Sequence, residues 1–178
     1  MIYERHLMDE FQDIVEKEKH RIFTLCRYIL GRHEDAEDVT QDVIVRLWKH
    51  WDRVQEMNIG AWLTRVARNA CIDLLRRRKR NAPTFAGVTY DVVIEVTADT
   101  RPDARKTLES SEIQTHVRQA LSEMDEPYRS ILILREIQEL QYNEISESLG
   151  MPLTSIKVYL HRGRQRLREL LRERVGNV

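Results

Sequence analysis

The hydrophobic positions of the chain follow a helical spacing over most of its length. Apolar residues recur every three or four positions, which places them on one side of an α-helix. Two glycines mark expected helix ends, Gly31 and Gly150, because glycine adopts the left-handed backbone conformation that other side chains resist. We predict helices over residues 8–30 (one long helix or two joined ones), 34–51, 60–80 (with Asn58 or Gly60 at its start), 110–124, a strongly apolar stretch around 131–137, and a helix pair around 145–149 and 152–167.

The helical pattern dissolves between residues 81 and 109, where prolines and a glycine interrupt it. Within this stretch, the apolar run TYDVVIEV at 89–96 fits either a short strand or a lightly packed linker. A connection of this length is uncommon inside one compact domain. We therefore predict an all-α protein of two small helical domains, 1–80 and 110–178, joined by a flexible linker.

The predicted helix over 60–80 carries two different stripes. One is apolar and fits a packed core: Leu63, Val66, Ala67, Ala70 and Leu74. The other combines an aromatic ring, an amide, a carboxylate and two guanidiniums: Trp62, Arg65, Asn69, Asp73 and Arg76. An aromatic ring stacks on an unpaired base, an amide hydrogen-bonds with the edge of the base, and a guanidinium binds the phosphates. The second stripe therefore predicts a surface for single-stranded nucleic acid.

The same helix ends in five consecutive cations over 76–80, which include Arg76 and Arg77. Their mutual repulsion is offset either by a polyanion or by bulk water. The alternative interpretation is a solvated basic helix end, with Trp62 as an aromatic residue at the edge of the core. The mixed stripe beside the cations favours nucleic acid.

The predicted helix over 34–51 has an outer face that is acidic but also partly apolar, with Trp48 on its flank: Asp38, Gln41, Asp42 and Val45. A face that keeps apolar groups in water is more often a protein-docking surface than a purely solvated one, which is the alternative. Asp35 lies near the start of this helix, where a carboxylate suits the helix dipole and can act as a cap.

The second domain contains a helix-turn-helix pattern. A short helix packs through Ile145 and Leu149, Gly150 makes the turn, and Pro152 starts a second helix. The outer face of the second helix carries groups that can read base edges, with cations at its margins for phosphate: Thr154, Lys157, Val158, His161, Gln165, Arg162, Arg164 and Arg166. A packed helical hairpin without DNA is the alternative.

Charge is distributed unevenly although the formal net charge is zero. Residues 34–42 hold five carboxylates and no Lys or Arg, whereas residues 151–178 hold seven cations and two carboxylates. The basic excess adds weight to DNA binding by the second domain.

Other classes of chemistry find little support in the sequence. Cys26 and Cys71 lack metal-ligand spacing, so we expect buried or idle thiols. No segment resembles a signal peptide or a membrane span, and we expect a cytoplasmic protein that is not inserted in a membrane. Because metal, phosphate-loop and nucleophile motifs are missing, we also expect no catalytic residues, no metal and no cofactor.

Three motifs in this order resemble an extracytoplasmic-function (ECF, group IV) sigma factor of the sigma-70 family: DAEDVTQDVIVRLWK, AWLTRVARNACIDLLRRRKR and the helix-turn-helix from Tyr142 to Leu167. The resemblance covers most of the chain, apart from the linker and the last residues. It implies an RNA polymerase sigma factor that directs core polymerase to specific promoters and assists promoter melting. Core RNA polymerase, promoter DNA and an anti-sigma factor are the implied partners.

The resemblance also implies a role for each surface. Docking on the clamp helices of the polymerase largest subunit falls on Asp35, Asp38, Gln41, Asp42 and Val45. Capture of the opened minus-10 strand falls on Trp62, Arg65, Asn69, Asp73, Arg76 and Arg77, with Asn69 where relatives contact an extruded base. Reading of the minus-35 duplex falls on Thr154, Ser155, Lys157, Val158, His161, Arg162 and Arg166. Departures from the family pattern at Val158, Tyr159 and Gly163 bear on promoter preference rather than on activity.

Two other functional classes are weaker. An autonomous helix-turn-helix repressor or activator, binding duplex sites as a dimer, would explain the second domain. It would leave the acidic face and the mixed stripe of the first domain without a role. An enzyme acting on DNA would need a catalytic cluster, and the sequence offers no convincing one.

Overall fold

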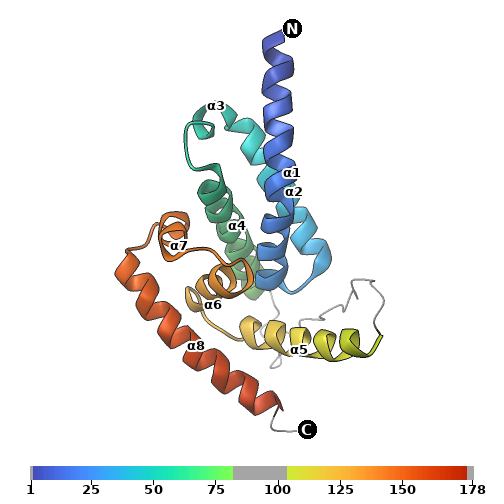
Figure 1. The fold of residues 1–178 in the computed structure, drawn as a ribbon, viewed down its shortest axis with the longest axis vertical. Helices are drawn as coiled ribbons and strands as arrows, with labels where there is room; N and C mark the ends of the chain where they lie inside the picture. The colour runs from blue at the N-terminus through green and yellow to red at the C-terminus, as the bar shows by residue number, and fades with distance from the viewer. Residues whose placement is uncertain (1, 82–103, 176–178) are drawn as a thin grey trace.

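The computed structural model describes residues 2–81 and 104–175, with the side chains of 7–81 and 113–174. These residues form helices joined by short turns, which confirms the predicted all-α fold (Figure 1). The apolar run at 89–96 lies outside the described residues. The helices are α1 Ile2–Leu30, α2 His33–Lys49, α3 Trp51–Val54, α4 Ile59–Asn81, α5 Ala104–Ser122, α6 Tyr128–Leu132, the π-helical turn η1 Ile133–Ile137, α7 Tyr142–Leu149 and α8 Leu153–Val175.

The first domain is formed by α1, α2, α3 and α4. One continuous helix, α1, spans the whole of the first predicted segment, and its N-terminal part stands above the rest of the molecule (Figure 1). It ends at Leu30 because Gly31 takes a left-handed φ of 77°. The core where these helices meet is apolar and closed to solvent: Leu25, Ile29, Val43, Leu47, Leu63 and Ala67.

The second predicted helix differs from expectation at both ends. It stops at Lys49, and His50 separates α2 from the short α3, so the predicted helix over 34–51 is two helices. Its first turn is not capped by Asp35, whose carboxylate instead forms an ion pair with Arg78 of α4. The carboxylate therefore joins two helices rather than closing the end of one.

The central helix of the molecule is α4, which packs against α1, α2 and α7. Its predicted start is confirmed by Asn58, whose side-chain oxygen accepts the N–H of Ala61 at 3.1 Å. The buried face is displaced from the predicted stripe, because Cys71 faces α1 and its thiol hydrogen-bonds with that of Cys26. Leu63 and Ala67 are buried as predicted, Val66, Ala70 and Leu74 are only half-buried, and Ala61, Thr64 and Cys71 are buried in addition.

The second domain is formed by α5, α6, η1, α7 and α8. The four consecutive apolar residues over 131–134 are each at most 1% exposed, which confirms the prediction that this stretch is central. Helix α8 approaches α6 closely at Gly163, where an added Cβ would lie 3.2 Å from Leu132. Glycine at this position therefore sets how near the two helices come.

The helix-turn-helix prediction is confirmed by α7 and α8. The first turn of α7 is closed by Glu144, which accepts the N–H of Gln141 at 2.6 Å. Gly150 ends α7 with a φ of 65°, and α8 begins at Leu153. The inner side of α8 carries Ile156 and Leu160, which are buried as its predicted stripe requires.

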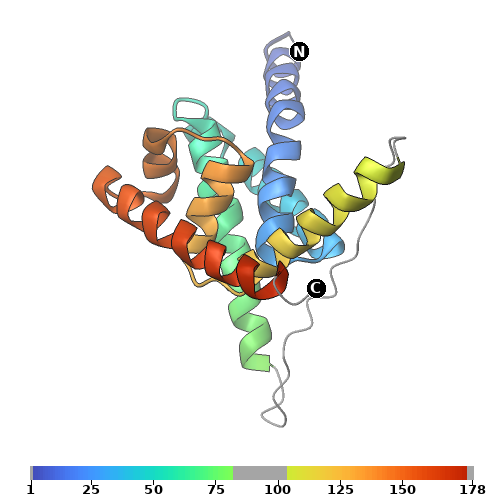
Figure 2. The ribbon, with the colours of Figure 1, turned by 60° about the horizontal axis from the view of Figure 1, so that its bottom comes forward.

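The two domains lie against each other. Helix α7 packs beside α4, and α5 contacts α1, an arrangement that can be followed in Figures 1 and 2. Helix α5 begins at Ala104, inside the predicted linker, so the domain boundaries 1–80 and 110–178 stay predictions. None of the helices in the described part of the chain is both long and apolar enough to cross a lipid bilayer.

We expect Gly150→Ala to destabilise the second domain by about 1–2 kcal/mol, because an L side chain with a Cβ is strained in the left-handed region. Gly150→Asn is the matched control, since asparagine tolerates this conformation better and should lose less. Urea denaturation of the full chain, followed by circular dichroism, measures both variants. Equal loss in the two variants would show that the left-handed turn is not the cause.

Candidate nucleic-acid interface

The predicted single-strand surface lies along one side of α4. Asn69, Asp73 and Arg76 are exposed. Trp62 is half-buried, with its ring edge-to-face against His50 at 6.4 Å between ring centroids. Asp73 and Arg76 form an exposed ion pair of 3.6 Å between Oδ1 and Nη1. An aromatic ring, an amide and a guanidinium are thus presented together on one helix, as contact with an unpaired base requires.

The basic end of α4 extends beyond the packed part of the molecule (Figure 2). Arg76, Arg77, Lys79 and Arg80 are exposed there, whereas Arg78 turns back to α2 and pairs with the Asp35 carboxylate. Because the other four cations face solvent, this end of the helix offers a concentrated positive charge to a polyanion.

Arg65 is the member of the stripe that has partners in the second domain. Its Nε donates to the carbonyl oxygen of Ser148 at 3.1 Å, and its Nη2 donates to the carbonyl oxygen of Glu147. Both carbonyls belong to the last turn of α7, where a helix leaves C=O groups without an intrahelical partner. Arg65 therefore lies on the predicted strand-binding side of α4 and also binds the end of another helix.

The sequence pattern did not single out Arg68, which is the other arginine of α4 that crosses to the second domain. Its side chain is 19% exposed, and it donates to the hydroxyl of Ser130 at 2.9 Å and to the carboxylate of Glu126 at 3.0 Å. A second stripe at helical spacing, less apolar than the predicted core face, lies beside that face and consists of Arg68, Cys71 and Leu75. This stripe is the sequence feature that could have indicated a further packed side of α4.

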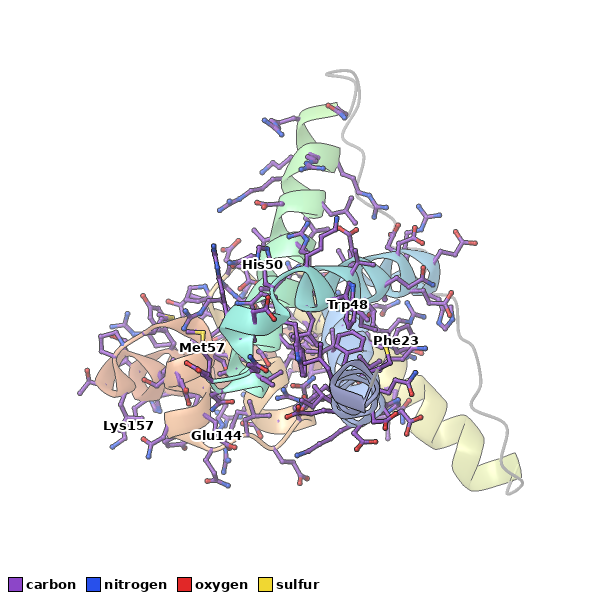
Figure 3. The ribbon with its side chains drawn as sticks, turned by 90° about the horizontal axis from the view of Figure 1, so that it is seen from above. Phe23, Trp48, His50, Met57, Glu144 and Lys157 are labelled. Carbon is purple, nitrogen blue, oxygen red and sulfur yellow. The ribbon has the colours of Figure 1, made fainter. Side chains whose placement is uncertain are left out.

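The predicted polymerase-docking face of α2 is exposed, except at its first member. Trp48 is 44% exposed beside it, labelled in Figure 3, and packs edge-to-face on Phe11 at 5.0 Å. Asp42 pairs with Arg46 at 3.2 Å on the surface. The exposed residues of the face are Asp38, Gln41, Asp42 and Val45. Acidic and apolar groups therefore lie together in solvent, and their docking role stays a prediction.

Asp35 differs from the rest of that face. Its side chain is 16% exposed, and Oδ1 pairs with Arg78, while the buried Oδ2 has no hydrogen-bond partner. The pair joins the start of α2 to the basic end of α4. Asp35 thus has a structural contact that the sequence pattern did not indicate, because the partner lies more than forty residues away.

The predicted duplex-reading face lies on α8. Ser155 is half-buried, and Arg166 pairs with Glu169 at 3.3 Å. Figure 3 shows Lys157 at the periphery of the molecule. The exposed residues of the predicted set are Thr154, Lys157, Val158, His161, Arg162 and Arg166. They share the outer side of α8, as the predicted reading of a major groove requires.

Two arginines of the second domain have pKa values shifted by their surroundings. Hydrogen bonds to the Glu136 carboxylate, 2.9 Å from Nε and 2.7 Å from Nη2, raise the pKa of Arg164 above its ordinary value. Burial lowers the pKa of Arg129, whose Nη2 donates to the carbonyl oxygens of Ser122 and Met124, both at 2.7 Å. Arg164, expected at the phosphate margin of α8, thus braces α8 against η1, and Arg129 braces the turn before α6.

The thiols of Cys26 and Cys71 are both free and fully buried, which confirms the prediction for them. The hydrogen bond to Cys26 and burial raise the pKa of the Cys71 thiol far above its ordinary value, so it stays protonated. Among the described residues, no three His, Cys, Asp or Glu side chains lie together in a way that could hold a metal ion.

Known families match both domains. The family described as Sigma-70 region 2 matches residues 14–81, which lie on α1 to α4. The family described as Sigma-70, region 4 matches residues 115–167, which begin on α5 and end on α8. The ECF RNA polymerase sigma factor SigW of Bacillus subtilis (strain 168) is 31% identical over 169 residues, covering 93% of this chain and 90% of SigW.

Two solved structures share the fold. The sigma factor RpoE of Bartonella quintana, in complex with the anti-sigma factor NepR, superposes with a TM-score of 0.69 at 22% identity, covering 92% of this chain and 97% of RpoE. CnrH, in complex with the cytosolic domain of CnrY, gives a TM-score of 0.65 at 22% identity, covering 92% of this chain and 88% of CnrH.

We expect Asp35→Asn and Arg78→Gln to be strongly non-additive in stability, because each removes the same partly buried ion pair. A double-mutant cycle should give a coupling free energy of about 1–3 kcal/mol. The surface pair Asp42→Asn and Arg46→Gln is the matched control, and should couple by no more than about 0.5 kcal/mol. Chemical denaturation measures both cycles. Equally small couplings would contradict the structural role of Asp35.

Proposed function

Because the chain belongs to the ECF group of sigma-70 family RNA polymerase sigma factors, we propose how its surfaces divide the recognition of a promoter. The mixed stripe of α4 captures the opened minus-10 strand, the outer face of α8 reads the minus-35 duplex, and the acidic face of α2 docks on polymerase. The observation that best supports this division is that α4 and α8 each bury one side while the residues for nucleic acid stay on the other.

Strand capture by α4 is consistent with the energies involved. Taking a base out of the stack costs a few kcal/mol. Stacking on an aromatic ring contributes about 1–3 kcal/mol per base, and phosphate contacts add to it. In this proposal the ring of Trp62 stacks, the amide of Asn69 hydrogen-bonds the extruded base, and Arg76 and Arg77 hold phosphates. These groups therefore stabilise an opened strand without any chemical step.

Duplex reading by α8 follows the usual division of labour in helix-turn-helix proteins. Thr154 and Lys157, in the first turns of α8, reach base edges in the major groove. Arg162 and Arg166, further along the helix, contact phosphates and fix the register. Val158 offers an apolar contact, such as the methyl group of thymine, where family members frequently carry a polar residue.

Docking on the clamp helices of the polymerase largest subunit uses Asp38, Gln41, Asp42 and Val45 of α2 in this proposal. A surface that combines carboxylates with an exposed apolar side chain suits a partner that is both basic and apolar at the contact. The exposed ring of Trp48 lies beside this face and extends its apolar part.

We further propose that an anti-sigma factor regulates the chain. The sigma factor RpoE, which shares its fold, was solved in complex with the anti-sigma factor NepR. We also infer that the chain contributes no covalent chemistry of its own, requires no metal or cofactor, and acts in the cytoplasm, where the polymerase performs RNA synthesis.

A reconstituted transcription assay tests the proposed function. The purified chain and core RNA polymerase are incubated, separately and together, with a library of promoter fragments. Specific initiation that requires both components is the expected result. Tight, specific duplex binding by the chain alone, with no effect on the polymerase, would refute the proposal and indicate an autonomous regulator.

We expect Asn69→Ala to lower the formation of open promoter complexes by about tenfold, because leaving the extruded base without its hydrogen-bond partner costs about 1–3 kcal/mol. Permanganate footprinting of unpaired thymines measures strand opening, and co-purification measures polymerase binding, which should not change. Asn143→Ala, an exposed asparagine of α7, is the control. Loss of polymerase binding in Asn69→Ala would show that the two faces have been interchanged.

We expect Lys157→Gln to weaken holoenzyme binding to minus-35 duplexes and to reduce the dependence of log affinity on log salt concentration by about one unit, because a cation at the DNA surface displaces counterions from the phosphates. Titrations at several salt concentrations measure the slope. Lys19→Gln, on α1, is the control. If the slope is the same for both variants, Lys157 does not lie in the DNA interface.

A further inference from the structure

The ring of His50 lies beside α4 but comes from another part of the first domain. His50 is the single residue between α2 and α3, and it is labelled in Figure 3. Its ring meets that of Trp62 edge-to-face, with 6.4 Å between the ring centroids and 63° between the ring planes. Two aromatic rings therefore lie next to each other, one on α4 and one on the junction of α2 and α3.

The backbone of His50 makes the turn between the two helices, and this role does not require a histidine. Its N–H donates to the carbonyl oxygens of Arg46 and Leu47 at the end of α2. Its carbonyl oxygen accepts the N–H groups of Arg53 and Val54. All of these contacts are made by the main chain, at a φ of −116°, which is ordinary for an L residue. Many other side chains would therefore permit the same turn.

The side chain of His50 is exposed, and in the part of the chain that the structure describes its ring nitrogens form no hydrogen bond or ion pair. Trp62 is half-buried, so His50 is the more accessible of the two rings. An edge-to-face contact uses the face of only one of its two rings. The pair of rings therefore keeps faces on which a planar ligand can stack.

A positive charge lies on the same side of the junction. Arg53 follows His50 by three residues, a spacing at which the side chains of a helical turn are neighbours. It is exposed, and it forms no ion pair with the other described residues, whereas the exposed Asp52 is two residues from His50 and faces elsewhere. An aromatic ring with a guanidinium beside it suits a base and its phosphate.

We propose that His50 is a second stacking ring for the opened strand and holds the nucleotide next to the one on Trp62. This inference deepens the proposed strand capture by α4 and rests on it. Aromatic side chains along a groove take successive bases, and they tolerate any sequence because every base has a π-face. His50 therefore adds affinity for an opened strand without adding a preference for one base.

The competing explanation is that His50 only supports the ring of Trp62. Loss of either ring would then weaken contact with the same nucleotide. If His50 stacks on a base of its own, the two rings depend on two different nucleotides. The experiment that separates these explanations has to identify the base that each ring contacts.

Holoenzyme is reconstituted from core RNA polymerase and the full chain with His50→Gln, Trp62→Leu or the matched control His20→Gln, at an exposed site on α1. The ligand is a promoter fragment that initiates in the transcription assay, with its minus-10 region left unpaired. A single abasic site at each unpaired position in turn removes one base and leaves the phosphates in place. Fluorescence anisotropy measures each affinity. Trp62→Phe is measured as well in case Trp62→Leu folds poorly.

We expect His50→Gln to lower the affinity for the intact fragment about fivefold relative to His20→Gln, because one stacked base is lost. This loss should vanish when one particular base is missing, and that base should neighbour the one at which the loss in Trp62→Leu vanishes. His50→Phe, which keeps a ring, should bind within about twofold of the wild type.

One shared abasic position for His50→Gln and Trp62→Leu would overturn the proposal and make His50 a support for Trp62. An affinity equal to that of His20→Gln, or a loss that persists at every abasic position, would also overturn it. Failure of the proposed function gives a different result, in which the wild-type holoenzyme is insensitive to every abasic site. Strand capture would then fail, and the role of His50 with it.

Discussion

Helix α4 uses three of its sides for three different contacts, and the other parts of the molecule are arranged around these sides. One side packs Leu63 and Ala67 into the core with α1 and α2, another carries Arg65 and Arg68 to the second domain, and a third presents Asn69 to solvent. A helix has room for such a division because its residues point outward at 100° intervals. In the first domain, α1 and α2 each pack against α4, and the short α3 packs against α2.

The bonds that join the domains are of the kind that forms and breaks readily. Each one uses an arginine, glutamine or asparagine donor and an oxygen acceptor, and several acceptors are backbone carbonyls at helix ends. Such bonds replace bonds to water and contribute little net free energy each. The buried apolar residues of the two domains belong to one cluster, so separation of the domains would break these bonds and also expose apolar surface.

Much of the fold could be predicted from the sequence because its signals are local. The left-handed turn at Gly150, the cap at Asn58 and the buried stretch over 131–134 each follow from a few neighbouring residues. The pair between Asp35 and Arg78 could not be predicted, because it depends on how two helices pack. The contact of Arg65 with α7 could not be predicted either. The helical pattern places Arg65 on the exposed side of its helix and does not indicate a partner in the second domain.

The two cysteines of the chain are packed together inside the first domain, between α1 and α4. A thiol reagent can therefore reach them only when that core opens, and the second domain carries no residue that reacts with it. The rate of alkylation therefore reports how often the core between α1 and α4 opens.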